Sequence, residues 1–248
     1  MHWIDIGCNL GHDSFDHDWT EVVDHAHAAG VVQLVLTGAS VEGSDRACEL
    51  ASQRPGALFA TAGIHPHLAT SFTSEAANHL ASLHQRPDVV AVGECGLDYF
   101  RDFSPRSAQH HAFEGQLELA LRCAKPLFLH QRDAHDDFLA ILKPIRDQLG
   151  PVVVHCFTDR RQALFDYLDL DCHIGITGWV CDERRGLQLK EMMPQIPADR
   201  LMLETDAPYL KPRNMRPKVR SHRNEPQWLP WIGGAVAALR GVSPDALA

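Results

Sequence analysis

Short apolar runs alternate along the chain with longer amphipathic stretches. Each run is about the length of a strand that is buried on both faces, as the strands of a parallel sheet are. The runs cover residues 3–7, 31–38, 58–63, 89–93, 126–129, 151–154, 173–178 and 200–205. The pattern therefore predicts eight buried strands.

The stretches between these runs repeat apolar residues at three- and four-residue steps, which is typical of amphipathic helices. The clearest of them are residues 18–30, 74–86, 107–124 and 136–150. Strands and helices that alternate in this way build an α/β fold, and eight such units predict a (β/α)8 TIM barrel. In that fold the active site lies on the loops that follow the strands.

Composition narrows the class of protein. The 248 residues contain no linker-like stretch, so we expect one domain over 1–248. No apolar segment is long enough for a membrane helix, and the opening MHWIDIGCNL lacks the basic start and apolar run of an export signal. We expect a cytoplasmic monomer with no membrane partner. The chain stops at SPDALA, one helix after the eighth strand, where we expect a closing turn to follow.

The cysteines and the net charge bear on two further classes of protein, disulfide-rich proteins and nonspecific nucleic-acid binders. Seven cysteines without a C-x-x-C pair argue against a disulfide framework or a thiolate zinc site, so we expect reduced thiols. The formal net charge of −9 disfavours nonspecific attraction to nucleic acid. A polyanionic substrate would therefore need a local basic surface.

Four residues that can bind a metal stand where predicted strands meet loops: Glu94, His130, His155 and Asp206. Their separations are 36, 25 and 51 residues, which fit one, one and two strand-plus-helix repeats. The four side chains should therefore converge at one end of the barrel. Imidazole and carboxylate are ordinary ligands of divalent metals, and Glu94 is placed to bridge two ions. A single histidine at a strand end is more often a hydrogen-bonded rim residue, but four such residues in register predict a metal site.

Asp206 lies in ETDAPYL after the eighth predicted strand. A carboxylate there can accept a proton from metal-bound water, so Asp206 is the candidate general base. The alternative is that Asp206 caps the following segment through its D-A-P turn.

Seven motifs in order resemble the TatD family of metal-dependent deoxyribonucleases, and they span nearly the whole chain. They are GIHPH (63–67), GECGLDY (93–99), HQRDA (130–134), HCFTD (155–159), GITGWVCDERRG (175–186), ETDAPYL (204–210) and RNEP (223–226).

The resemblance implies an amidohydrolase-like barrel that hydrolyses phosphodiester bonds of single-stranded DNA from the 3′ end, in DNA repair or degradation. It implies a divalent metal, Mg²⁺ first and Mn²⁺ or Zn²⁺ as alternatives, with Glu94 and Asp206 as catalytic residues. The metal and catalytic positions of the family match Glu94, His130, His155 and Asp206. His65 and His67 match positions near the substrate pocket, where a structural role remains open for each.

One departure from the family pattern concerns the first strand. Most members carry a His-x-His pair there, whereas this chain has Gly7 and Asn9. Glycine has no ligand atom and an amide oxygen binds a hard cation only weakly. We therefore expect one metal to bind tightly and a second to bind only with substrate. His12 is expected to be solvent-exposed.

A basic segment follows Asp206 in an otherwise acidic chain. Residues 211–223 carry six cations that could contact a nucleic-acid backbone: Lys211, Arg213, Arg216, Lys218, Arg220 and Arg223. The alternative is a solvated loop stiffened by prolines. Arg132 is a further phosphate-binding candidate, against a structural pair with Asp133 or Asp136.

Several residues near strand ends have two open interpretations. Asp98 is placed to orient a ligand or a substrate group. Tyr99 and Phe100 could stack on a base, although aromatic residues at such positions more often pack on the barrel rim. Trp179 has the same two interpretations, and Glu225 is expected to anchor the loop after the eighth strand.

Two other functions remain open from the sequence. The same site could attack a carbonyl carbon, as in amidohydrolases or an aminoacyl-tRNA deacylase, because barrels host many chemistries. Alternatively, the substitutions at Gly7 and Asn9 could leave a nucleic-acid-binding protein without catalysis. RNA also remains open as a substrate.

Overall fold

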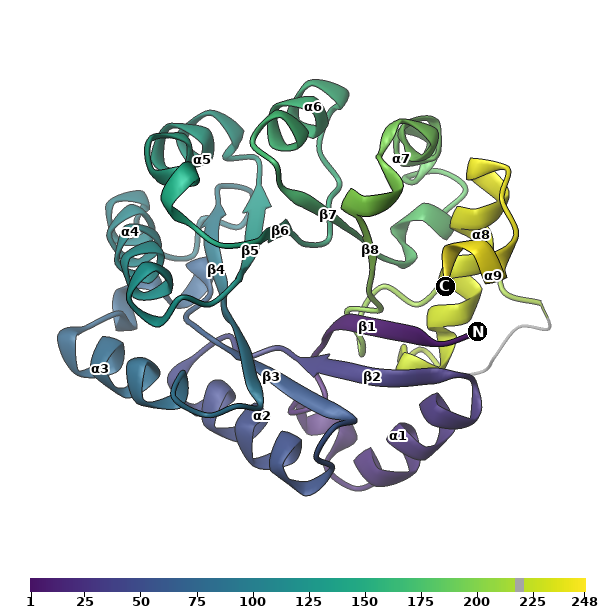
Figure 1. Ribbon diagram of the computed structural model, residues 1–248, viewed down its shortest axis with the longest axis horizontal. Coiled ribbons are helices and arrows are strands. Elements are labelled where there is room, and N and C mark those ends of the chain that lie inside the picture. Colours follow the sequence, from purple (N-terminus) through teal and green to yellow (C-terminus); the bar gives the residue numbers. More distant parts are fainter. Residues whose placement is uncertain (217–220) are drawn as a thin grey trace.

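The computed structural model describes residues 1–216 and 221–248 and shows a parallel barrel ringed by helices (Figure 1). All eight strands form one sheet in sequence order, and every neighbouring pair is parallel. The strands are β1 (Trp3–Cys8), β2 (Val31–Leu36), β3 (Leu58–Ala62), β4 (Val89–Asp98), β5 (Leu127–Arg132), β6 (Val152–Val154), β7 (His173–Ile176) and β8 (Leu201–Leu203). The predicted (β/α)8 TIM barrel is confirmed.

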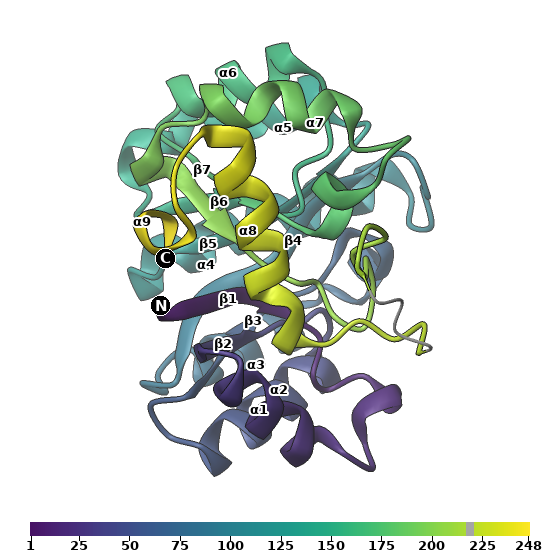
Figure 2. The same ribbon diagram turned by 90° about the vertical axis from the view of Figure 1, so that its right-hand side faces the viewer.

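The α-helices surround the sheet, and α8 runs along its outer side beside β1 and β8 (Figure 2). They are α1 (Trp19–Ala28), α2 (Val41–Gln53), α3 (Ser74–Leu83), α4 (Arg106–Cys123), α5 (His135–Leu142), α6 (Arg161–Asp169), α7 (Leu187–Met192), α8 (Leu229–Arg240) and α9 (Pro244–Leu247). Short 3-10 turns are η1 (Asp13–Phe15), η2 (Pro66–Ser71), η3 (Lys143–Gln148), η4 (Gly178–Cys181), η5 (Met193–Gln195), η6 (Ala198–Arg200) and η7 (Pro226–Trp228).

Helix starts follow local sequence signals. The side chain of Ser40 accepts a hydrogen bond from the Gly43 N–H at the start of α2, and Thr73 does the same for Ala76 at the start of α3. Each cap satisfies a backbone donor that the first turn leaves without a partner. The apolar face of each helix then packs on the strands, as Val22 and Val23 of α1 do in the core.

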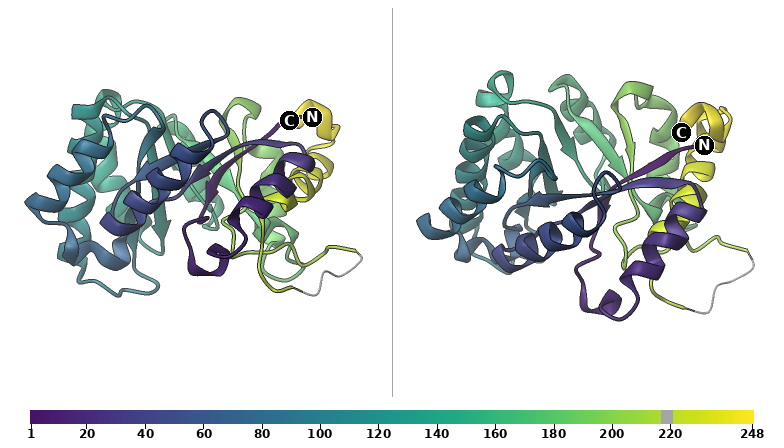
Figure 3. Two further views of the ribbon diagram at one scale, coloured as in Figure 1. Left: turned by 90° about the horizontal axis from the view of Figure 1, so that it is seen from below. Right: turned by 60° about the horizontal axis from the view of Figure 1, so that its bottom comes forward.

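Backbone hydrogen bonds join the first strand to the segment after the last one. The Asp206 N–H donates to the Gly7 carbonyl at 2.8 Å, and the Asn9 N–H donates to the Ala207 carbonyl at 2.7 Å. These bonds fix Asp206 beside β1 at the carboxyl end of the barrel. The chain termini lie close together on the opposite side of the molecule from this segment (Figure 3).

The structure corrects several predicted boundaries. The helix predicted over 136–150 is α5 followed by η3, because Pro144 lacks the N–H and ring space that a continuing α-helix requires. Strands β4 and β5 run past the predicted 89–93 and 126–129, so Glu94 and His130 lie within strands and not at their ends. Strand β8 is shorter than the predicted 200–205, which leaves Asp206 on the following loop.

Two predictions about the whole chain can be compared with the structure. All seven cysteines are free, as expected for reduced thiols. Among the helices of residues 1–216 and 221–248, none has the length and apolar character needed to cross a membrane.

Candidate metal centre

The carboxylate of Glu94 lies at the centre of three imidazole rings. Its Oε1 atom is 2.7 Å from His155 Nε2, 3.0 Å from His130 Nδ1 and 3.3 Å from His65 Nε2. These residues come from β4, β5 and the loops after β6 and β3, and all four side chains are mostly buried. The structure thus brings together Glu94, His130 and His155, three of the four residues that the sequence predicts to be ligands.

Asp98 forms a second layer behind this cluster. Its Oδ2 atom lies 3.1 Å from His130 Nε2 and 2.8 Å from His67 Nε2, while Oδ1 accepts the Arg101 N–H at 2.8 Å. Burial alone would raise the pKa of Asp98, but the hydrogen bonds from His130, Arg101 and His67 hold that pKa well below its usual range. Asp98 is therefore an anion that orients the His130 ring, the role that a carboxylate beside a metal-binding histidine commonly has.

The protonation of the cluster follows from its crowded carboxylates. Burial lowers the pKa of His130, but the hydrogen bonds of Asp98 and Glu94 outweigh it and raise that pKa overall. The charges of Glu94 and Glu204 likewise raise the pKa of His155 well above its usual value against burial. Burial raises the pKa of Glu94, but the charge of His155 and the hydrogen bonds of His130 and His155 bring it well below its usual value. Protons thus provide the positive charge that neutralises these carboxylates.

His65 differs from the other two histidines. Its Nδ1 atom accepts the His67 N–H at 3.1 Å, so in the neutral ring Nε2 carries the hydrogen and donates it towards Glu94. Burial lowers the pKa of His65 to about 4, which keeps the ring neutral. While the bond to the His67 N–H remains, His65 is a hydrogen-bond donor to Glu94 and its Nε2 lone pair is not available to a metal.

Asp206, the fourth predicted ligand, lies close enough to Glu94, His155 and Glu204 for their charges to act on it. Its backbone adopts a left-handed φ of 53°, which aspartate tolerates better than most residues, and its Oδ1 accepts a hydrogen bond from Asn9 Nδ2 at 2.9 Å. Burial raises the pKa of Asp206 to about 7, with the charges of Glu94 and Glu204 adding to the effect and His155 opposing it. Asn9 therefore serves as a donor that orients Asp206.

Sequence reasoning did not single out Glu204, which is fully buried beside Asp206. Its Oε1 accepts the Cys156 N–H at 2.5 Å, and its Oε2 lies 3.4 Å from His155 Nδ1 without a hydrogen bond. The carboxylate passes between two glycines: a Cβ on Gly175 would be 2.6 Å from Oε1, and a Cβ on Gly7 would overlap Oε2. The signal in the sequence was a second carboxylate in ETDAPYL, two residues before Asp206.

These residues fit a divalent cation. Among the described residues, His155 Nδ1 and Glu204 Oε2 are buried polar atoms without a hydrogen-bond partner, which is costly unless something else binds them. The candidate donor atoms of His65, Glu94 and His130 lie within 4.8 Å of one another. Of these, the tautomer of His65 argues against direct ligation, so Glu94, His130 and His155 are the better set. Mixed carboxylate and imidazole donors suit Mg²⁺, Mn²⁺ or Zn²⁺.

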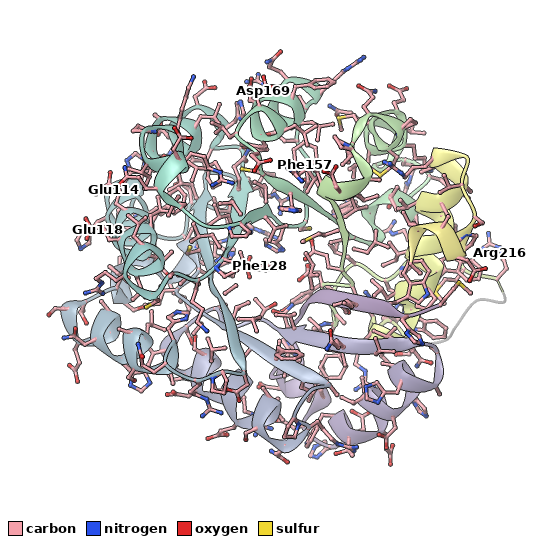
Figure 4. All side chains as sticks on the ribbon, viewed as in Figure 1. Glu114, Glu118, Phe128, Phe157, Asp169 and Arg216 are labelled. Atoms are coloured by element: carbon pink, nitrogen blue, oxygen red, sulfur yellow. The ribbon has the colours of Figure 1, made fainter. Side chains whose placement is uncertain are left out.

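The predicted substrate-binding residues are placed differently from one another. His65 and His67 lie at the candidate metal centre, with their ring centroids 4.2 Å apart. The Arg132 guanidinium stacks 3.9 Å from the Phe100 ring centroid. Phe128 lies in the middle of the barrel, where its ring packs against His155 at 4.5 Å (Figure 4).

The basic segment after β8 is partly occupied by ion pairs. Arg223 binds Asp18 and Glu225 at 2.6 and 2.9 Å and is only 22% exposed, which argues for a structural role. Through Asp18 it ties this segment to the loop after β1, and the two run side by side (Figure 3). Arg213 lies 3.3 Å from Asp182 but is 59% exposed.

The other cations of the segment differ in whether the structure describes them. Lys211 and Arg216 donate to the carbonyl groups of Ser221 and Met215. Lys218 and Arg220 lie outside the described residues.

The remaining residues with two open interpretations are partly packed on the barrel rim and partly exposed to solvent. The Tyr99 hydroxyl donates to Asp137 at 2.6 Å and lies 2.5 Å from His110 Nε2, so Tyr99 is a rim residue. Trp179 is half-buried with Arg185 5.5 Å from its ring. His12 is exposed, as expected.

Comparison with known proteins agrees with these features. The family model described as TatD related DNase matches residues 4–248. The chain is 54% identical over 244 residues to the "3'-5' ssDNA/RNA exonuclease TatD" of Erwinia billingiae, covering 98% of this chain and 94% of that protein. The protein of the same name from Klebsiella pneumoniae is 52% identical over 238 residues, covering 96% and 90%.

A solved structure shows the same relationship. The chain is similar to the crystal structure of YJJV, a TatD homolog from Escherichia coli K12, with a TM-score of 0.88 and 27% identity over 99% of this chain and 93% of that one. Because the family model spans nearly the whole sequence and full-length relatives are about half identical to it, the chain belongs to the family of TatD-related DNases.

Proposed function

We propose that this protein is a metal-dependent 3′–5′ exonuclease that hydrolyses phosphodiester bonds of single-stranded DNA. The observation that carries the proposal is the buried Glu94, His130 and His155 cluster, in a chain whose full-length relatives are named 3'-5' ssDNA/RNA exonuclease. Those relatives are named for RNA as well as DNA, so we include single-stranded RNA among the substrates.

We assign each residue of the site a role from its position. Glu94, His130 and His155 would hold a divalent cation, Mg²⁺ in our proposal, and Glu204 and Asp206 would complete its surroundings from the segment after β8. When bound, such a cation stabilises charge on a phosphate and makes a water nucleophilic near neutral pH. Asp98 keeps the His130 ring in place, and His65 keeps Glu94 oriented.

Asp206 is our candidate for the proton acceptor. Its carboxylate lies near Glu94 and His155, where it could accept a proton from a metal-bound water. Asn9 holds one of its carboxylate oxygens by a hydrogen bond at 2.9 Å. We further propose that one domain over 1–248 acts as a cytoplasmic monomer in DNA repair or degradation.

The test is product analysis on single-stranded DNA labelled at either end, in EDTA and then in Mg²⁺, Mn²⁺ or Zn²⁺. We expect label at the 3′ end to be released first as a mononucleotide, only with metal. Glu94→Gln and Asp206→Asn should lose at least about 100-fold in rate, whereas Asp169→Asn, an exposed carboxylate of α6, should not. Metal-independent binding without cleavage, or cleavage of ester and amide substrates alone, would overturn the proposal.

A further inference from the structure

The loop between β4 and α4 exposes two phenylalanines next to the metal centre. Phe100 is 53% exposed and Phe103 is 68% exposed, although both follow directly on the strand that carries Glu94. A single exposed phenylalanine is common on protein surfaces, but two on one loop beside the candidate metal cluster are a feature that the packing of the protein does not explain.

This exposure does not come from a loosely held loop. The buried Asp98 accepts the Arg101 N–H at 2.8 Å, and the Ser104 hydroxyl donates to the His67 carbonyl at 2.9 Å. The side-chain amide of buried Gln109 accepts the Asp98 N–H at 2.9 Å and donates to the Ser104 carbonyl at 2.9 Å. Both ends of the loop are therefore fixed, and the two rings are presented to solvent from a rigid support.

Phe103 adjoins the candidate metal cluster, and Phe100 adjoins positive charge. The Phe103 ring centroid lies 4.9 Å from that of His67, whose Nε2 is bonded to the Asp98 carboxylate that also holds His130. Arg132 lies 3.9 Å and Arg101 5.6 Å from the Phe100 ring centroid. Stacking on a ring orients a guanidinium without using its N–H donors, which remain suited to phosphate.

We propose that Phe100 and Phe103 form a stacking platform for the bases at the 3′ end of a single strand, while Arg101 and Arg132 face its phosphates. This proposal rests on the proposed function. The occupant follows from the chemistry: flat apolar rings beside guanidinium groups match a chain of planar bases and anionic linkages, whatever its sequence. Arg223, in the alternative basic segment, is already paired with two carboxylates.

The first test measures binding and turnover of variants. Phe100→Ala/Phe103→Ala should bind a fluorescein-labelled single strand about tenfold more weakly in EDTA by anisotropy, and raise KM by a similar factor with kcat unchanged. The matched control is Phe165→Ala on α6, a 37% exposed ring with Arg161 5.6 Å from its centroid, which should bind like the wild type.

The second test removes the bases instead of the rings. A strand with abasic sites at its last few 3′ positions should bind the wild type about as weakly as the double variant binds the normal strand. The double variant should not distinguish the two strands. The platform would be overturned if the double variant lost as much affinity for the abasic strand as for the normal strand. It would also be overturned if the double variant kept the wild-type affinity, or if the wild type did not bind the strand at all. If the wild type binds single-stranded DNA but never shortens it with metal, the exonuclease proposal fails. The anisotropy measurements still decide whether Phe100 and Phe103 bind the bases.

Discussion

The carboxylate of Glu204 occupies the space that any side chain at Gly7 would need. A Cβ on Gly7 would overlap Glu204 Oε2 and would stand 2.9 Å from Phe128 Cζ. Gly7 is the position where the family pattern has the first histidine of its pair. Gly7 and Glu204 are therefore complementary, because the missing side chain on β1 leaves the room that this buried carboxylate fills.

The first prediction concerns this complementarity. Gly7→Ala should push the Glu204 carboxylate out of its slot and weaken the binding of Mn²⁺ by about tenfold or more, because a ligand group is misplaced. Titration calorimetry of the metal-free protein measures this. Gly234→Ala is the control, since a Cβ there has open space. Equal Mn²⁺ affinity in both variants would show that Glu204 does not need the glycine.

The second prediction uses the raised pKa of Asp206. Between about pH 4 and pH 7 the folded, metal-free protein keeps a proton that the unfolded chain releases, so stability falls as pH rises through this window. Asp206→Asn removes the effect. In EDTA the variant should match the wild type near pH 4 and exceed its unfolding free energy by at most about 4 kcal/mol near pH 8. Urea unfolding at both pH values decides it, and a gap that does not grow with pH would contradict the prediction.

The third prediction concerns buried His84, whose pKa shift has the opposite effect. Burial lowers the pKa of His84 to about 4, and its Nδ1 atom has no hydrogen-bond partner among the described residues. The unfolded chain takes up the proton first as pH falls, so stability is lost between about pH 6.5 and pH 4.

His84→Gln should remove that loss, which is at most about 3 kcal/mol. The expected result is that the wild type weakens relative to the variant when urea unfolding is moved from about pH 7.5 to about pH 4.5 in EDTA. The idea fails if the difference between the two proteins is the same at both pH values.

The fourth prediction separates two arginines of the segment after β8. Arg223→Ala should lower the unfolding free energy by roughly 1–2 kcal/mol, because it leaves Asp18 and Glu225 without their partner. Arg213→Ala should leave stability within about 0.5 kcal/mol, but raise KM for single-stranded DNA and reduce its salt dependence by about one charge. The opposite assignment of the two effects would restore Arg223 as a substrate contact.

The sequence predicted the barrel and the meeting of Glu94, His130 and His155 because a strand-plus-helix period is a property of spacing. It did not predict Glu204, because a buried carboxylate in a strand-end motif looks the same whether it caps a turn or faces the site. The glycines that make room for Glu204 are 168 residues apart along the chain, from Gly7 to Gly175. Only their convergence in space shows what they do.

The roles of Arg223 and Phe103 on the surface also could not be predicted from the sequence. Arg223 has the charge of a phosphate ligand, but its partner Asp18 lies on a loop more than two hundred residues away. Phe103 is an apolar residue that the sequence gives no reason to expose, and hydrogen bonds of buried Gln109 and Asp98 hold it there. Long-range pairing decides both cases.

The proposal that Glu94, His130 and His155 bind a divalent cation is tested most directly by calorimetric titration of Mn²⁺ into the metal-free protein. The titration is done near neutral pH in buffers of different ionisation enthalpy. His130 and His155 have raised pKa values in the metal-free cluster, so a cation that binds them must displace protons. Ligation by His130 and His155 should release about one proton or more per bound ion, and Glu94→Gln should lose the binding. Tight binding without proton release, or unchanged binding in that variant, would contradict it.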